Sequence, residues 1–494
     1  MTLSSVTWVE LAKTGSGAFT SMVTLPVPAP RPGYARDVRT SLRSLLLPLA
    51  LTLGVLVATG APVPEAEAAP ATTKPAGVPT AVVDPGHAGM RKYYEALRDA
   101  AAGKRVARAL HYGDSTLAAD GISRTVRARL AARFGDAGPG FVSGANDPRW
   151  NKRSDVETTR RGDWSYRTIL LGGAGGRYGL GGVVAIGSSG ASLVTRAVDA
   201  AKATKLQKRL EVWYQAGAGY GTVWAKTDDR EVLRAPATAA ATEDRRFVLD
   251  VPAGFSALSV GASGGPVPIY GVVMETGAPG TTWESLGVIG VGSKSFSTFN
   301  AAHLTAQTAQ RAPDLIVVML GGNEASYPVL TTGKGAGYVP IYAAALATVR
   351  AGAPTASCLV VTPLDQGYFD TPPPVEGAVA PVEAPVATEG TAPVAGAAPV
   401  AGAAAAPPVE RGPPKSRPGM PNLVAGQRAA ATAAGCAFWS AYDAMGGAGS
   451  ALAWARTSLG SGDLVHLSPR GLEVIGNHLS DAILGDYDAW AAGR

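Results

Sequence analysis

The stretch VARALHYGDS, residues 106–115, decides the fold. Its first seven residues are mostly apolar and are typical of a β-strand, which ends at Gly113. Beyond Ser115, apolar residues recur at every fourth position and predict an amphipathic helix: Ile122, Val126 and Leu130. A serine at such a strand-to-helix turn lies beside outward-pointing backbone N–H groups, which favour developing negative charge. Ser115 is therefore a candidate nucleophile.

A second motif, DLVH at residues 463–466, lies close to the C-terminal end of the sequence. His466 is a candidate base, and Asp463, three residues earlier, is a candidate partner that orients the imidazole. With Ser115 these residues complete a Ser-His-Asp set, which is recognised by geometry and roles and not by its order in the chain. We predict a catalytic triad from these two motifs.

Other serine and histidine motifs are less suited to catalysis. The remaining histidines are interpreted as structural or exposed: His87, His111, His303 and His478. The string GASGG at 261–265 matches a nucleophile elbow around Ser263, but the elbow requires a helix immediately afterwards. Pro266 follows instead, so this string is interpreted as a glycine-rich turn. No cluster with metal-ligand spacing is found, and we expect neither a metal nor another cofactor.

Strands and helices alternate in the flanking parts of the chain. Continuous apolar runs predict strands buried on both faces of a parallel sheet, and they lie at 314–320, 358–361 and 436–439. Helical patterns cover 88–102, 340–351, 425–434 and the segment after Pro469. This alternation predicts an α/β fold with a parallel sheet and helices on both faces, forming three layers.

Residues 141–280 break this alternation. They are rich in glycine and contain short β-like runs, with no helical pattern longer than about three turns. We predict an inserted antiparallel β-sandwich domain. Its aromatic side chains can either form the core or stack on sugar rings, and they are Trp150, Trp164, Tyr166, Trp213, Tyr214, Tyr220 and Trp224.

Residues 371–420 are rich in Pro and Ala and contain no aromatic residue, Leu or Ile. Such a segment cannot bury enough apolar surface to become ordered, so a disordered insert is predicted. Cys358 and Cys436 both open apolar runs. They either form a disulfide, which export would permit, or remain buried free thiols.

The N-terminal region, residues 1–68, resembles a secretory signal. Basic residues precede the uncharged apolar stretch 45–61, and the small-x-small sequence 66–68 follows it. An uncleaved membrane anchor is the alternative, and the start of translation can lie downstream at Met22. Both readings deliver the rest of the chain to the periplasm or the exterior.

Length and charge narrow the functional class. A chain of 494 residues is too long for one ordinary core, so two domains with accessory segments are expected. The net charge of +6 is spread along the sequence without a Lys/Arg block, which argues against nucleic-acid binding.

The ordered blocks of the sequence resemble the SGNH hydrolases, also called GDSL esterases. The resemblance covers residues 104–135, 281–325 and 455–485. The segments 111–142 and 271–300 look more narrowly like the periplasmic peptidoglycan O-acetylesterases, which carry a carbohydrate-binding-like β module at the same place as 141–280. The hydrolase domain implied by the resemblance covers 69–140, 281–370 and 421–494, with the β module at 141–280. The signal region at 1–68 and the Pro/Ala insert at 371–420 are predicted from their composition, and the insert is not a feature expected of the family.

The same resemblance implies roles for individual residues. Ser115 would be the nucleophile, His466 the general base and later acid, and Asp463 its orienting carboxylate. The oxyanion hole would combine the backbone N–H groups of Ser115 and Gly290 with the side-chain amide of Asn323. The chain departs from the family in two places, because relatives usually read Asn-Gly-Ala at 289–291, where this chain reads IGV, and Gly-x-Asn-Asp at 321–324, where it reads GGNE.

The expected function is an exported serine esterase that removes O-acetyl groups from a polysaccharide, most plausibly peptidoglycan. An O-acetyltransferase with the same triad is one alternative, because only the acceptor differs. A cell-wall-binding protein without catalysis is another. The expected partner is an acetylated cell-wall glycan, and a membrane would be involved only through an uncleaved anchor.

Overall fold

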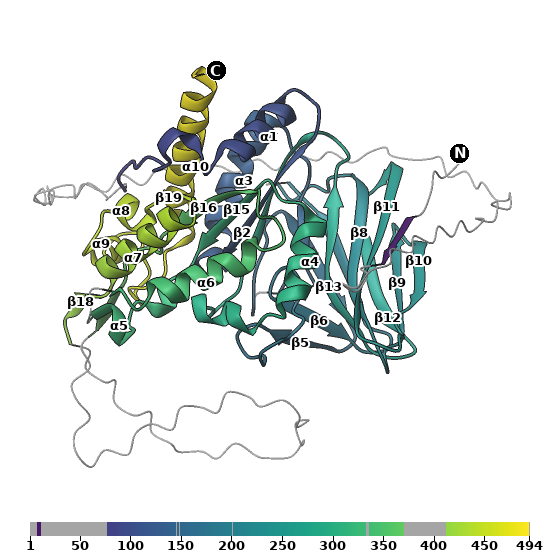
Figure 1. The fold of residues 1–494 in the computed structure, drawn as a ribbon. Helices are drawn as coiled ribbons and strands as arrows, with labels where there is room; N and C mark the ends of the chain where they lie inside the picture. The colour runs from purple at the N-terminus through teal and green to yellow at the C-terminus, as the bar shows by residue number, and fades with distance from the viewer. Residues whose placement is uncertain are drawn as a thin grey trace, which may run out of the picture.

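The computed structural model describes residues 77–369 and 412–493, apart from 145, 148, 200 and 332–334, together with the short strand β1 (Thr7–Glu10). The predicted signal region therefore lies outside the described residues except for this strand. The same holds for most of the predicted Pro/Ala insert. The described residues form an α/β domain and a β-sandwich, which Figure 1 shows side by side.

A five-stranded parallel sheet forms the centre of the α/β domain. Its strands run in the order β14-β2-β15-β16-β19, and every neighbouring pair is parallel. The strands are β14 (Gly280–Gly287), β2 (Val106–Gly113), β15 (Leu315–Met319), β16 (Ser357–Val361) and β19 (Ala437–Trp439). The predicted α/β class is confirmed. Strand β14 was not predicted, because Thr281, Thr282, Glu284 and Ser285 give it a polar sequence although all four are buried.

Helices cover both faces of this sheet. One face carries α1 (Arg91–Ala101), α3 (Gly121–Phe134) and α10 (Pro469–Ala492), whose apolar side chains pack with those of β2 and β15. The other face carries α4 (Ala301–Arg311), α6 (Val339–Arg350) and α7 (Met420–Ala433). Shorter elements complete the domain: η1 (Pro85–His87), α2 (Ser115–Ala118), η2 (Ser293–Thr298), η3 (Gly322–Glu324), α5 (Pro328–Thr331), α8 (Ala441–Met445) and α9 (Ser450–Ala455).

The inserted domain consists of two antiparallel sheets, as predicted. The larger sheet has the order β1-β11-β8-β13-β6-β5 with β3 beside β13, and the smaller has the order β10-β9-β12-β7-β4. The strands are β3 (Gly140–Ser143), β4 (Val156–Arg161), β5 (Trp164–Thr168), β6 (Val183–Gly187), β7 (Ser192–Ala197), β8 (Gln207–Ala216), β9 (Thr222–Thr227), β10 (Arg230–Pro236), β11 (Glu243–Phe255), β12 (Leu258–Ser263) and β13 (Val267–Glu275). Alternate side chains from the two sheets, such as Val212 and Val223, form the core between them.

The larger sheet of the sandwich also packs against the α/β domain. Trp213 and Tyr270 share one apolar cluster with two residues of the α/β domain. These are Phe299, just before α4, and Leu304, within α4. Figure 1 shows α4 beside β13 accordingly. Trp213 and Tyr214 are thus core residues, whereas the other aromatic residues considered for sugar stacking are only partly buried.

Charged side chains are buried at the same domain boundary. Arg311, at the end of α4, donates to Glu275 of β13 at 2.8 Å and also bonds Glu284 of β14. Burial raises the pKa of Glu275, but the charges of Arg311 and Arg108 outweigh it and lower this pKa to about 2. Because breaking such a buried pair leaves an uncompensated charge, these contacts fix the sandwich on the α/β domain.

The end of the Pro/Ala segment requires a correction. Strand β18 (Pro414–Ser416) pairs with β17 (Gly367–Phe369), and α7 begins at Met420, so ordered residues occupy the final part of the predicted 371–420 insert. The polar and proline-rich sequence of β18 is not typical of a strand, and the strand forms because it pairs with β17.

The structure also joins Cys358 and Cys436 in a disulfide. This bond decides between the disulfide and the two free thiols that the sequence left open.

Candidate active site

The turn that carries Ser115 is held by its two preceding residues. Gly113 is required because a Cβ there would lie 2.7 Å from Leu117 Cβ and 2.9 Å from the carbonyl oxygen of Met319. The buried Asp114 caps α2, since its Oδ1 accepts the Thr116 N–H at 3.0 Å. Burial raises the pKa of Asp114, and backbone N–H groups, including that of Gly322, oppose the shift.

The helix after Ser115 is interrupted, unlike the continuous helix that the sequence predicts. Helix α2 is a single turn, and Asp120 then adopts a left-handed conformation with φ 64° before α3 begins. The Asp120 carboxylate is held there by Arg127 at 2.9 Å and by the Ser154 N–H at 2.7 Å. These two bonds compensate for a conformation that residues other than glycine rarely adopt.

The loop before α10 positions His466. Asp463 Oδ2 lies 2.7 Å from His466 Nδ1, and Asp463 Oδ1 accepts the backbone N–H groups of Val465 and His466 at 2.9 Å. Burial raises the pKa of Asp463, but the hydrogen bonds from His466 and Val465 outweigh it and lower this pKa to about 2. The carboxylate is therefore ionised at neutral pH and fixes the imidazole.

The two segments meet through one hydrogen bond. Ser115 Oγ lies 3.0 Å from His466 Nε2. Because His466 Nδ1 faces a carboxylate, it carries the hydrogen, and Nε2 is left as an acceptor for the serine hydroxyl. The side chains of His466 and Asp463 are 45% and 47% exposed, so this chain of hydrogen bonds is open to solvent.

The predicted oxyanion donors come from two neighbouring segments. Gly290 has φ 84°, in a turn directly after β14, and the Val288 N–H in that turn donates to the Gly113 carbonyl at 3.0 Å. Asn323 lies within η3 and is not a helix N-cap, a position held by Gly321. Its Nδ2 donates to the Val291 carbonyl at 2.7 Å, which orients the amide and leaves its second hydrogen for another acceptor.

Glu324 connects these same two segments. It is fully buried, and its carboxylate accepts the backbone N–H of Ser293. Burial raises the pKa of Glu324. The Glu324 side chain therefore links η3 to the start of η2.

The other candidate motifs lie elsewhere. His111 is buried, its Nδ1 accepts the Trp283 indole N–H at 3.2 Å, and burial lowers its pKa to about 3. His87 pairs with Asp486 at 3.0 Å. Ser263 ends β12, which is followed by β13 and not by a helix.

Sequence reasoning missed the contribution of the sandwich to this site. The Ile289 N–H donates to the Trp150 carbonyl at 3.0 Å, and the Leu170 side chain lies against Gly290. Both residues belong to the inserted domain. No local motif could indicate these contacts, because they depend on how the two domains pack.

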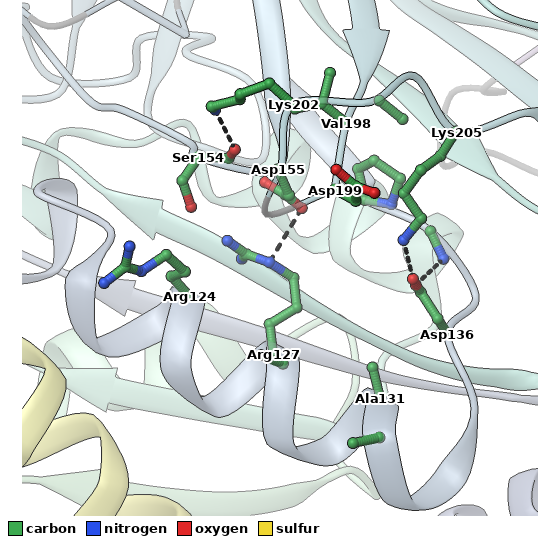
Figure 2. A pocket seen from close by; sticks show the side chains of 15 residues that line it. Arg124, Arg127, Ala131, Asp136, Ser154, Asp155, Val198, Asp199, Lys202 and Lys205 are labelled. Atoms are coloured by element: carbon green, nitrogen blue, oxygen red, sulfur yellow. Dashed lines mark hydrogen bonds and ion pairs between the residues drawn. The ribbon is translucent and has the colours of Figure 1, made fainter.

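A separate cavity of about 490 Å³ lies between α3 and the sandwich and is lined by none of the residues of the hydrogen-bonded chain. Its charges are largely paired internally. Figure 2 shows Arg127 directed at Asp155, Lys205 at Asp136, and Lys202 at the backbone of Ser154. We therefore interpret this cavity as a gap lined by paired polar groups at the boundary between the two domains.

Comparison with known proteins supports the fold. No protein-family profile matches the chain, and no curated protein matches it in sequence. A solved peptidoglycan O-acetylesterase is similar over 83% of this chain and 99% of its own, with a TM-score of 0.62 and 21% identity. The chain shares the fold of that esterase. The predicted resemblance is thus confirmed for the architecture, including the inserted β module.

More distant structures are also similar. A family two carbohydrate esterase from Clostridium thermocellum matches 66% of this chain and 100% of its own, with a TM-score of 0.26 and 11% identity. An acetyl xylan esterase from Butyrivibrio proteoclasticus matches 68% of this chain and 100% of its own, with a TM-score of 0.22 and 9% identity.

Among the described residues, no helix is both long enough and apolar enough to cross a membrane.

Proposed function

We propose that the protein is an exported serine esterase that removes O-acetyl groups from a cell-wall polysaccharide, peptidoglycan. The observation that carries this proposal is the chain of hydrogen bonds from Ser115 through His466 to Asp463, with lengths of 3.0 and 2.7 Å. The shared fold with a peptidoglycan O-acetylesterase supports the substrate class. The Cys358–Cys436 disulfide is typical of proteins outside the reducing cytosol and supports export to the periplasm or the exterior.

The first half of the reaction forms an acyl-enzyme. Ser115 Oγ attacks the ester carbonyl while His466 Nε2 accepts its proton, and Asp463 stabilises the resulting imidazolium. The N–H groups of Ser115 and Gly290 and the Asn323 amide stabilise the oxyanion. The bond from the acyl carbon to the sugar oxygen then breaks, and His466 donates its proton to that oxygen, which leaves as a hydroxyl.

The second half releases the acid. Water attacks the acyl group on Ser115, and His466 accepts a proton from that water. Collapse of the second tetrahedral intermediate breaks the bond to Ser115 Oγ, which recovers its proton from His466. Acetate leaves, and the starting enzyme is restored.

Acetate release from O-acetylated peptidoglycan and from acetylated xylan, measured side by side, tests this proposal. We expect faster release from peptidoglycan by the wild type and none by Ser115→Ala. Release from neither polysaccharide nor a small acetyl ester would contradict esterase function. Transfer of acetyl to an added glycan acceptor in preference to water would favour the acetyltransferase alternative.

A further inference from the structure

Exposed aliphatic residues lie on two chain segments that meet at Gly290, the glycine of the candidate oxyanion hole. Six large apolar residues are strongly exposed among the described residues, and three of them are Leu170, Leu171 and Ile289, at 39%, 70% and 39% exposure. Ile289 directly precedes Gly290. A Cβ placed on Gly290 would lie 2.9 Å from Leu170 Cδ2, so Leu170 covers this glycine. We call Leu170, Leu171 and Ile289 the aliphatic patch.

The aliphatic patch is held by specific bonds from both domains. Leu170 and Leu171 lie in a turn closed by the Gly172 N–H, which donates to the Thr168 carbonyl at 2.8 Å. The neighbouring Ile169 carbonyl accepts the hydroxyl of Thr298 in η2 at 3.1 Å. On the other side, the Ile289 N–H donates to the Trp150 carbonyl. The patch is therefore a defined surface at the junction of the sandwich and the α/β domain.

We propose that the aliphatic patch binds the acyl chain of the ester and lets the enzyme accept chains longer than acetyl. The inference rests on the proposed esterase function. In the proposed acyl-enzyme the carbonyl oxygen faces the Gly290 N–H, which places the substituent on the carbonyl carbon near Gly290 and near the Leu170 side chain that lies against it. Aliphatic side chains exclude water from an alkyl chain but offer no partner to sugar hydroxyls.

The chemical step remains the same for a longer chain. Ser115 Oγ forms an ester with the acyl carbon, the alcohol leaves with the proton from His466, and water releases the carboxylic acid. No further reactant is required. Ile289, which directly precedes Gly290, offers an alkyl surface at 39% exposure. We interpret it as part of the surface that sets acyl preference.

The test measures kcat/KM for p-nitrophenyl acetate, butanoate and hexanoate, because these esters vary the acyl chain with one leaving group. Burial of alkyl groups in the patch should raise kcat/KM by at most about fourfold per added methylene. We expect the hexanoate-to-acetate ratio to fall at least about fivefold in Ile289→Asn and in Leu171→Ser. Leu206→Ser is the matched control, since Leu206 is a leucine of the sandwich with 59% exposure outside the patch.

Three outcomes would overturn the inference, and they separate it from the proposed function. If the wild type hydrolyses p-nitrophenyl acetate well but loses most of its activity on the butanoate, the binding of longer acyl chains is contradicted and the proposed esterase function is not. Patch variants with the control's chain-length ratio but a raised KM for glycan would assign the patch to the sugar. If the wild type hydrolyses none of these esters, both the proposed function and this inference are contradicted.

Discussion

Two Asp–His pairs with the same internal geometry occupy opposite environments in this molecule. His466 Nδ1 lies 2.7 Å from Asp463, and His303 Nδ1 lies 2.7 Å from Asp244. The first pair is nearly half exposed, whereas the second is 0% and 5% exposed. The bond that defines an oriented imidazole therefore occurs in both environments, and it does not by itself make a base.

The third partner distinguishes the two pairs. His466 Nε2 faces the Ser115 hydroxyl, whereas His303 Nε2 accepts the backbone N–H of Gly179 at 3.0 Å. His303 lies on α4, and Asp244 and Gly179 belong to the sandwich. One pair can thus exchange a proton with a reactant, while the other ties two domains together.

Matched substitutions separate these roles most strongly. His466→Gln should lower kcat by about 10⁴-fold or more, because the serine loses its base, and it should leave the melting temperature nearly unchanged. His303→Gln should keep most of the activity but lower the free energy of unfolding by about 1–3 kcal/mol, because buried partners lose their bonds. Kinetics and thermal melting on the same preparations check both. The reverse pattern would contradict the comparison.

The carboxylates give the next largest effect. Asp463→Asn should lower kcat by about 10³- to 10⁴-fold, because the wrong tautomer of His466 is then favoured.

The pH dependence of the wild type gives a related prediction. The folded pKa of Asp463 is about 2, below the ordinary range, so the carboxylate stays ionised as pH falls and loses its charge only near that value. The acid limb of a wild-type pH–rate profile above pH about 4 should therefore not arise from Asp463. A loss of activity that tracks protonation of this carboxylate near neutral pH, followed by NMR, would contradict this.

Asn323→Ala should have a smaller effect than loss of the triad. We expect kcat to fall by about 100- to 1000-fold with little change in KM, because the amide bond strengthens only in the transition state. The amide also bonds the Val291 carbonyl, so some stability is lost as well. Melting temperature and kcat should be measured on one preparation. A loss of stability with wild-type kcat would assign Asn323 to structure alone.

Removal of the Pro/Ala segment should have the smallest effect. The deletion should span residues 374–410, because β17 and β18 pair from Gly367 with Ser416 to Phe369 with Pro414. This hairpin must be kept, since the Gly367 N–H donates to the Leu464 carbonyl within the loop that carries His466. With a short Gly/Ser linker, melting temperature and activity on a small ester should barely change. A fall of many degrees would show that the segment packs on the domain.

The parts predicted from sequence are those encoded locally. Ser115 follows an apolar strand, and Asp463 and His466 are three residues apart, so short motifs were sufficient to propose them. The alternating apolar runs likewise predicted the parallel sheet. The structure brings the proposed residues within hydrogen-bond distance, although their catalytic roles remain a proposal.

The parts that were missed depend on tertiary contacts. Strand β14 is polar in sequence, and it becomes buried because Arg311 compensates Glu284 and β2 pairs along its length. The break at Asp120 depends on Ser154 of the sandwich. Leu170 reaches Gly290 only through domain packing. Periodicity cannot reveal any of these features, because each partner is distant in the chain.

Covalent trapping of the nucleophile tests the central claim most directly. A fluorophosphonate reacts with an activated serine, and peptide mapping then identifies the modified residue. We predict a single modification at Ser115 in the wild type, strongly reduced labelling in His466→Gln, and unchanged labelling in His303→Gln. Modification of Ser263, or no modification of a preparation that hydrolyses acetyl esters, would contradict the account.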